Sequence, residues 1–139
     1  MAAPQPSGHT IPLSNNSLQL LEPDIAVPQY DRSALTPGII HIGVGNFHRA
    51  HQGMYLDKLF ALGEDHDWSL IGAGIRPHDA ALRADLEGQD WLTTVVELDP
   101  NGLTARICGS MIGYIETDPA ALIAALIRPE IRIVSLTIT

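Results

Sequence analysis

The sequence predicts an α/β fold with a mainly parallel sheet. Short apolar runs rich in β-branched residues alternate along the chain with segments of helical periodicity. These runs are apolar throughout, which is typical of strands that are buried on both faces of a parallel sheet. Of the 139 residues, 45% are hydrophobic, which is enough for one domain with its own core and too many for a disordered chain.

Residues 1–37 are expected to form a proline-rich arm, and residues 38–139 the ordered domain. Six prolines interrupt the arm: Pro4, Pro6, Pro12, Pro23, Pro28 and Pro37. Proline fixes φ and removes a backbone donor, so long regular elements are not expected there. Because the arm also carries apolar residues between Leu20 and Val27, we expect it to pack onto the domain.

The domain begins with a predicted strand, helix and strand. Residues 39–43 (IIHIG) indicate a buried strand, and apolar residues at helical spacing predict a helix over 46–62 that ends at Gly63. A second buried strand is predicted over 68–75 (WSLIGAGI). A short helix over 77–86 should follow, with Pro77 in its first turn.

The second half departs once from this alternation. Residues 93–98 and 103–111 predict two strands joined by a turn at 99–102 (DPNG), which we interpret as an insertion or an antiparallel excursion. Asp118 and Pro119 then favour the start of a helix that continues through 120–127. Residues 131–138 predict a further buried strand.

The stretch from Gly43 to Ala50 (GVGNFHRA) carries the clearest functional signal. It joins a predicted strand directly to a predicted helix, and this is the setting of a dinucleotide-binding loop in a Rossmann-like fold. Gly43 would permit the tight turn, Gly45 would admit a pyrophosphate, and the helix start would face the phosphates. The usual third glycine is replaced by His48, so we expect the small Ala50 to provide the close helix–strand contact. A glycine-rich turn without a ligand remains the alternative.

A dinucleotide site also needs an acidic residue after the second strand to bind the adenosine ribose. Asp79 is the candidate, and its charge would repel the 2′-phosphate of NADP, so NAD is favoured. Arg76 lies nearby and could accept that phosphate, which leaves the choice open. Asp79 could equally be a helix-capping acid beside Pro77.

Composition argues against several other classes of protein. Sixteen acidic against eight basic residues give a net charge of −8, without a basic stripe for nucleic acid. The single cysteine, Cys108, excludes a disulfide framework and suggests a cytoplasmic protein. Apolar runs are too short to span a membrane, and residues 1–7 lack the features of a secretory signal. His48 and His51 have no third ligand nearby, so no metal site is expected.

The segment from Gly38 to Gln52 (GIIHIGVGNFHRAHQ) strongly resembles the mannitol 2-dehydrogenases, which belong to the polyol-specific long-chain dehydrogenases. The likeness continues through 67–76 (DWSLIGAGIR), 85–90 (DLEGQD) and 129–139 (PEIRIVSLTIT). It covers nearly everything after the arm. The GxGxFHRAHQ pattern is much more specific than a bare GxG.

This resemblance implies a metal-independent enzyme that oxidises D-mannitol to D-fructose with NAD. The family uses a lysine base in a helical C-terminal domain that has no counterpart here, so we expect an N-terminal, NAD-binding fragment that is inactive alone and exposes a sheet edge. A fructuronate or tagaturonate reductase fragment, or a non-catalytic binding module, are the alternatives. The residues expected to contact the cofactor are Ile42, Gly43, Val44, Gly45, Asn46, Phe47, His48, Arg49, Ala50, His51 and Asp79.

Overall fold

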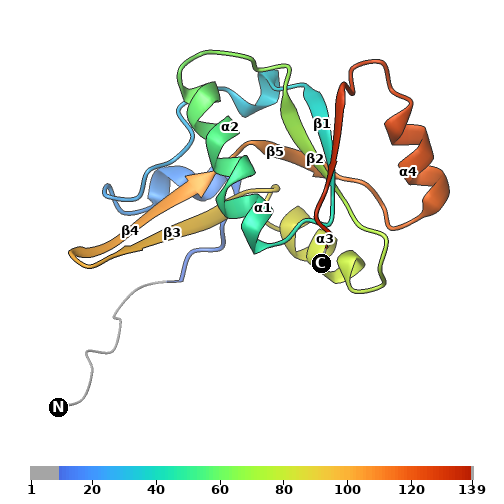
Figure 1. The fold of residues 1–139 in the computed structure, drawn as a ribbon. Helices are drawn as coiled ribbons and strands as arrows, with labels where there is room; N and C mark the ends of the chain where they lie inside the picture. Colours follow the sequence, from blue (N-terminus) through green and yellow to red (C-terminus); the bar gives the residue numbers. More distant parts are fainter. Residues whose placement is uncertain (1–9, 139) are drawn as a thin grey trace.

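A computed structural model of the chain describes residues 10–138. Its first half contains the 3₁₀ helices η1 (Asn15–Leu20) and η2 (Arg32–Ala34), then β1 (Pro37–Ile42), α1 (Asn46–Ala50), α2 (Gln52–Ala61), β2 (Ser69–Ala73) and α3 (Asp79–Glu87). Its second half contains β3 (Thr93–Asp99), β4 (Gly102–Cys108), β5 (Met111–Tyr114), α4 (Pro119–Leu126) and β6 (Ile133–Leu136). The expected alternation of strands and helices is therefore present (Figure 1).

Four strands form a parallel sheet in the order β5-β2-β1-β6. Strand β1 is central: Ile40 lies opposite Ile71 of β2 on one side and opposite Val134 of β6 on the other. The chain builds outward from β1 to β2 and β5, and then returns to the other side of β1 with β6. This reversal gives the first four strands of a Rossmann sheet, with its switch point between β1 and β6.

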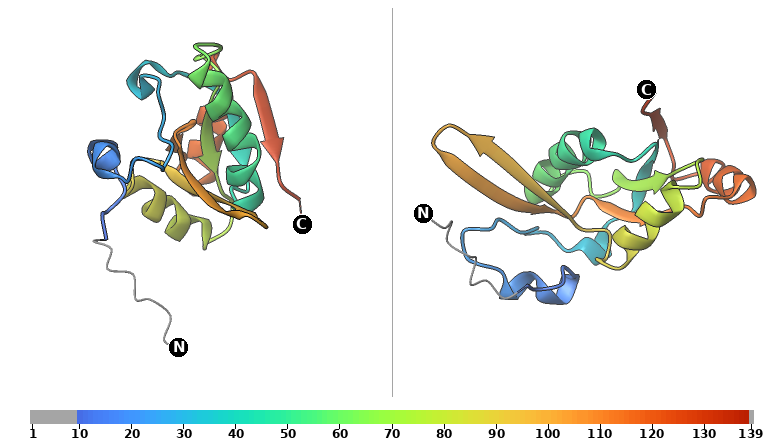
Figure 2. Two further views of the ribbon diagram at one scale, coloured as in Figure 1. Left: turned by 90° about the vertical axis from the view of Figure 1, so that its left-hand side faces the viewer. Right: turned by 90° about the horizontal axis from the view of Figure 1, so that it is seen from below.

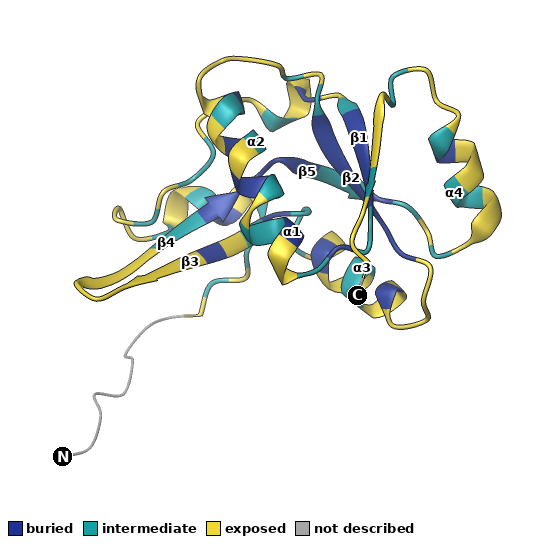
Figure 3. Ribbon diagram, in the orientation of Figure 1, coloured by how far each residue is buried: buried dark blue, intermediate teal, exposed yellow. Residues whose placement is uncertain are grey.

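The two faces of the sheet pack against different helices. On one face, Ile39 and Leu70 pack in a cluster that includes Leu56 of α2 and Leu86 of α3. On the other face, the neighbouring positions Ile40 and Ile71 pack against Ala125 of α4 and adjoining residues. This alternation explains why the strands are apolar throughout: β1 and β2 are dark blue in Figure 3, with neither face left to solvent.

The expected antiparallel excursion is a separate two-stranded sheet of β3 and β4, with Leu98 opposite Leu103 near its tip. It projects away from the parallel sheet (Figure 2). The predicted strand over 103–111 is wrong at its end, because β4 stops at Cys108 and β5 begins at Met111. The backbone N–H of Gly109 donates to buried Asp57 (2.9 Å), and Ser110 donates to the carbonyl of Gly53 (2.7 Å). These distant partners fix the corner, which local periodicity does not reveal.

Strand β6 is present but is not buried, contrary to the prediction. Ile133 and Val134 are each 45% exposed, and Leu136 is 59% exposed. Within the described residues, β6 pairs only with β1 and forms an edge of the sheet. An apolar run therefore indicated a strand correctly without indicating how many neighbours cover it.

The helices begin and end close to the predicted positions. The helix expected over 46–62 has an irregularity at His51 that divides it into α1 and α2, and Gly63 follows with a left-handed φ of +82°. Asp118 caps α4 by accepting from the N–H of Ala121 (2.9 Å). Helix α3 begins two residues after Pro77, so this proline precedes the first turn.

The described part of the arm packs on the domain. The Arg32 guanidinium donates to the carbonyls of Gly109 (2.9 Å), Asp90 (2.9 Å) and Met111 (2.8 Å), which joins the arm to the hairpin and the sheet. Ala26 forms a bridge to Arg106 of β4. Pro4, Pro6 and the segment 1–7 considered for a secretory signal lie outside the described residues. The division of the chain at residue 37 stays a prediction.

Candidate functional site

The carboxyl ends of three parallel strands meet at a cavity of about 260 Å³. The cavity lies where β1, β2 and β6 end, beside the switch point at which open α/β sheets bind their ligands. Its lining residues are Ile42, Gly43, Ile75, Arg76, Asp79, Leu136, Thr137 and Ile138. The sheet topology therefore brings three of the predicted site residues, Ile42, Gly43 and Asp79, to one place.

The glycine loop forms one wall of this region. Gly43 has φ +93°, a left-handed conformation that favours glycine, and its N–H donates to the Ala73 carbonyl (2.9 Å). A Cβ on Gly43 would lie 3.3 Å from the carbonyl oxygen of Thr137. A Cβ on Gly45 would meet nothing within 4 Å. Gly43 is therefore needed for the turn itself, whereas the missing side chain of Gly45 leaves an open approach to the backbone.

Helix α1 begins immediately after the loop. Gly45 occupies the N-cap position, and no side chain caps this end of the helix, so the first-turn N–H groups are not satisfied by a capping side chain. Arg49 adds positive charge here: its side chain donates to the Gly45 carbonyl (3.2 Å) and to the Asn46 side chain (2.7 Å). A helix start with an adjacent guanidinium favours a negatively charged ligand such as a pyrophosphate.

The other predicted contact residues divide between solvent and core. Asn46, Phe47 and His51 are exposed on α1 and its junction with α2, and Asn46, Arg49 and Ala50 line a second cavity of about 180 Å³ against β3. Val44 is buried in the core. Its side chain faces away from the open loop, so only its backbone could take part in binding.

Asp79 is buried at the carboxyl end of β2, with 4% of the residue exposed. Its Oδ2 accepts from the N–H groups of Ile75 (3.0 Å) and Arg76 (2.8 Å), which holds the turn between β2 and α3. A Cβ on Gly74 would lie 2.2 Å from the Cβ of Asp79, so glycine is required for this close approach. The carboxylate thus organises the turn before α3 and also lines the cavity. The helix-capping alternative is wrong, because the N-cap residue of α3 is His78 and no side chain caps this helix start.

The charge of Asp79 acts on two neighbouring side chains, Arg76 and Tyr114. The Arg76 Nε lies 3.8 Å from Oδ2, although the Arg76 side chain is 57% exposed. Burial, together with the negative charge of Asp79, raises the pKa of Tyr114 to about 12. Arg76 therefore remains at the rim of the cavity, where a ligand could contact it.

The His48 side chain lies in the core, stacked on His41 of β1. The ring centroids are 3.7 Å apart and the ring planes differ by 2°. The expectation that Ala50 provides the close helix–strand contact is therefore wrong, because Ala50 packs instead against Met54, Val95 and Cys108. A flat imidazole pair fills the helix–strand gap that the third glycine usually keeps narrow.

Sequence reasoning missed the contribution of β6 to the site. Leu136, Thr137 and Ile138 line the cavity, and the Thr137 N–H donates to the Ile42 carbonyl (3.0 Å). Their signal was available: residues that end a predicted parallel strand lie at the ligand-binding edge of the sheet. That signal identifies the residues once the strand order is known.

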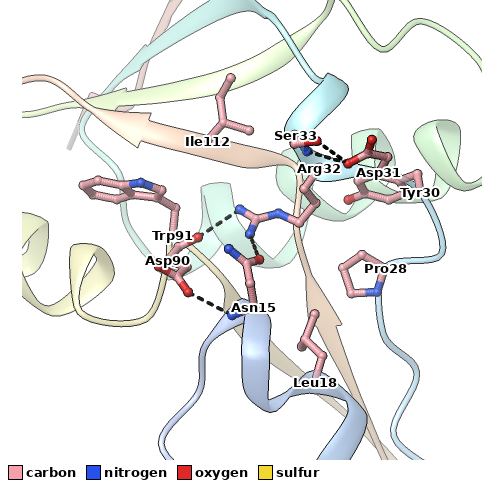
Figure 4. Close-up of a pocket in the computed structure, with 10 residues that line it drawn as sticks. All are labelled: Asn15, Leu18, Pro28, Tyr30, Asp31, Arg32, Ser33, Asp90, Trp91 and Ile112. Atoms are coloured by element: carbon pink, nitrogen blue, oxygen red, sulfur yellow. Dashed lines mark hydrogen bonds between the residues drawn. The ribbon is translucent and has the colours of Figure 1, made fainter.

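A cavity of about 520 Å³ lies between the arm and the domain. Figure 4 shows Arg32 pointing toward Asn15 and Asp90, and Arg32 also donates to the carbonyl of Met111, the first residue of β5. The three carbonyl acceptors of Arg32 and the bond to Asn15 occupy its guanidinium group. None of the residues predicted to contact the cofactor lines this cavity.

Two further searches of residues 10–138 gave no candidates. No cluster of three or more His, Cys, Asp or Glu side chains in this part of the chain is arranged to hold a metal ion. Within the same residues, no helix has the length and apolar character required to cross a membrane.

Comparison with known proteins decides the family. The profile of the mannitol dehydrogenase Rossmann domain matches residues 37–139. The chain belongs to the mannitol dehydrogenase family. The chain corresponds to the N-terminal, NAD-binding Rossmann part of mannitol 2-dehydrogenase homologues.

Individual members of the mannitol dehydrogenase family agree with this assignment. The mannitol 2-dehydrogenase of Cereibacter sphaeroides is 65% identical over 114 residues, which are 81% of this chain and 24% of that protein. The enzyme of Pyricularia oryzae is 42% identical over 120 residues, which are 85% of this chain and 24% of that protein.

Two solved structures match the fold closely. The ternary complex of Pseudomonas fluorescens mannitol 2-dehydrogenase with NAD and D-mannitol has a TM-score of 0.86 and 46% identity, covering 90% of this chain and 26% of that one. A substrate-free D-sorbitol dehydrogenase has a TM-score of 0.81 and 33% identity, covering 91% and 27%. The chain thus spans about a quarter of the length of these family members.

Proposed function

We propose that the chain binds NAD through the loop Gly43–Ala50 and Asp79. We propose further that, within a complete enzyme, it serves the oxidation of D-mannitol at C2 to D-fructose. The observation that carries the proposal is the direct passage from β1 through Gly43 and Gly45 into α1 at the switch point of the sheet. The Pseudomonas relative, which binds NAD and D-mannitol, supports both the cofactor and the substrate.

The residues present fit this cofactor. The open space at Gly45 and the uncapped start of α1 suit the pyrophosphate, and the cavity beside Asp79 suits the adenosine ribose. When bound, NAD supplies the hydride acceptor for the substrate carbon. The chain's own residues bind the cofactor and orient it.

The isolated chain is proposed to bind the cofactor without catalysing the reaction. Hydride transfer from an alcohol also needs a base that takes the hydroxyl proton. The one lysine, Lys58, is exposed in the last turn of α2, well beyond the glycine loop. Incubation of the chain with D-mannitol and NAD should therefore produce no NADH absorbance above a protein-free control.

A matched pair of glycine substitutions tests cofactor binding. Gly45 has an extended backbone (φ −134°, ψ −171°) that valine tolerates, so Gly45→Val should fold and should block the pyrophosphate with its side chain. Gly113→Val on β5 is the control, because a Cβ there also meets nothing within 4 Å. Calorimetric titration with NADH should detect binding to the wild type and to Gly113→Val, and at least about tenfold weaker binding to Gly45→Val.

Equal NADH affinity in the three proteins would contradict the assignment of the loop.

The comparisons do not favour the alternatives, a non-catalytic interaction module or a fructuronate or tagaturonate reductase fragment, because the relatives described above are mannitol 2-dehydrogenases and a sorbitol dehydrogenase.

A further inference from the structure

The stacked histidines connect three elements directly beneath the glycine loop. His41 lies on β1 and His48 on α1, and both are buried, at 5% and 2% exposure. The two ring nitrogens of His41 lie 2.8 Å from the Ser135 hydroxyl and 2.9 Å from the Thr137 hydroxyl at the end of β6. The pair therefore joins α1 to the two strands between which the switch point lies.

The position of His48 gives the stack a geometric role. A glycine at this place in dinucleotide-binding loops lets the helix approach the strand closely. A side chain here would ordinarily push the first turn of α1 away from β1. A planar ring lying parallel to a second planar ring occupies only the 3.7 Å between the centroids.

We propose that His41 and His48 are positioning residues that act through the glycine loop. Their flat stack sets the distance between β1 and the first turn of α1, and so holds the Gly43–Gly45 backbone in the conformation that accepts a pyrophosphate. This inference rests on the proposed function, because it assigns a role in NAD binding to two buried side chains that support the loop from within the core.

The surroundings keep both rings uncharged near neutral pH. Burial, together with smaller contributions from the neighbouring His41 and Arg49, lowers the pKa of His48 to about 4, and burial also lowers the pKa of His41. From α2, the Gln52 carbonyl oxygen accepts from Nδ1 of His48 (2.9 Å), and from β6 the neighbours are the uncharged Ser135 and Thr137. The Nε2 of His48 has no hydrogen-bond partner within the described residues. Both rings of the stack are thus uncharged near neutral pH, where NADH binding is to be measured.

Two substitutions separate ring shape from mere burial. His48→Phe keeps a flat ring on His41, whereas His48→Leu keeps an apolar side chain but replaces the plane with a branched one. NADH affinity near neutral pH should stay within about threefold of wild type for His48→Phe and fall at least about tenfold for His48→Leu. His66→Phe, at the opposite end of the sheet, controls for loss of a partly buried histidine and should bind like the wild type.

Hydrogen exchange of the backbone amides provides a second readout that does not need the cofactor. Exchange over residues 44–49 should be faster in His48→Leu than in His48→Phe, with exchange in β2 unchanged in both. Uniformly faster exchange in β2 as well would indicate global destabilisation and overturn the positioning role. His41→Leu makes the same test from the strand side if His48→Leu does not fold.

The outcomes distinguish this inference from the proposed function. Absence of NADH binding to the wild type would overturn the proposed function, and the exchange pattern would still test the positioning of the loop. Equal affinity and equal loop exchange in the leucine and phenylalanine variants would overturn the positioning role while NAD binding stands.

Discussion

Asp79 combines two demands at the scale of a single residue. Its Oδ2 accepts two backbone N–H groups, and its Oδ1 lies 3.5 Å from Nε2 of His78. The carboxylate is thus fixed beside the cavity by the same bonds that stabilise the turn after β2. A charge held in one place discriminates between ligands better than a mobile one, because it cannot move away from a second negative charge.

Removing the charge of Asp79 should therefore relax the preference for NAD over NADP. Asp79→Asn retains an oxygen that can accept from the turn, and Asp79→Ala removes both oxygens. The ratio of the dissociation constants for NADPH and NADH should fall at least about tenfold in both, or roughly 1.4 kcal/mol. An unchanged ratio in Asp79→Asn would transfer the preference to Arg76 or to another residue.

His48 makes stability depend on pH. Its pKa is about 4 in the folded protein against an ordinary value of 6.5, so the unfolded chain binds the proton more readily between these values. The free energy of unfolding should be fully retained above about pH 6.5 and should fall by about 3 kcal/mol as the pH falls toward 4. His41 adds to the loss in the same direction.

Urea denaturation at a series of pH values between these limits measures the effect. His48→Phe cannot bind the proton, so its free energy of unfolding should decline less steeply with falling pH than that of the wild type. Parallel curves for the two proteins would contradict the assigned cause.

At the scale of elements, buried Asp57 on α2 connects the arm, the helix and the hairpin. Its Oδ1 accepts from the Tyr30 hydroxyl (2.5 Å) and from the Gly109 N–H (2.9 Å), and its Oδ2 accepts from Arg106 (3.2 Å). Asp57 is 1% exposed, so solvent does not compete for these bonds in the folded chain. One side chain therefore determines how the β3–β4 hairpin joins the parallel sheet.

Asp57→Ala should destabilise the fold by about 3 kcal/mol, because it leaves a buried N–H and a partly buried guanidinium without their acceptor. Tyr30→Phe removes one donor only and should cost about 1 kcal/mol. Urea denaturation compares the two variants. Similar small losses in both would mean that water or a rearranged Arg106 replaces the carboxylate.

The corner between β4 and β5 illustrates which features of the fold can be predicted from the sequence and which cannot. The glycine loop, α4 with its cap at Asp118, and the strands up to residue 75 depend on neighbours in the chain, and these were predicted correctly. The corner between β4 and β5 depends on Asp57 and Gly53, more than fifty residues away. Periodicity carries no information about such partners, so the boundary was missed.

The candidate site likewise combines residues that the local sequence pattern identifies with residues that only the folded sheet brings together. The Gly43–Ala50 loop and Asp79 could be proposed from local pattern alone. The inward position of His48 and the cavity wall formed by Leu136–Ile138 depend on contacts between β1 and β6, which only the folded sheet establishes. The predicted burial of β6 was also wrong, because an apolar sequence indicates a strand but does not indicate whether that strand lies at the edge of the sheet.

At the scale of the whole molecule, the exposed edge is the most unusual property. Residues 133–136 contain no charge, and the chain carries exposed apolar side chains on β6 and on α4, such as Ile123 at 61% exposure. Edge strands of stable monomers usually carry lysine, proline or a bulge that prevents pairing with another copy. Within the described residues, β6 has none of these.

The 139-residue chain should therefore self-associate, and a charge on the edge should reduce this. Val134→Lys places a lysine on β6, and Leu98→Lys makes the same kind of change at the tip of the hairpin, where Leu98 is 82% exposed. Sedimentation velocity should detect a smaller associated fraction for Val134→Lys than for wild type, with Leu98→Lys close to wild type. Equal association of all three would exclude the edge as its cause.

The position of β6 beside β1 also has a kinetic consequence. His41 and its hydroxyl partners Ser135 and Thr137 are 94 and 96 residues apart in the chain. Contacts between residues so far apart in the chain form slowly. The entropy cost of closing so long a loop is incurred before the contacts can offset it. Strand β6, whose docking depends on these distant contacts, is thus the strand that completes the cavity beside Asp79. A dinucleotide that binds only this docked state would favour the final folding step by mass action.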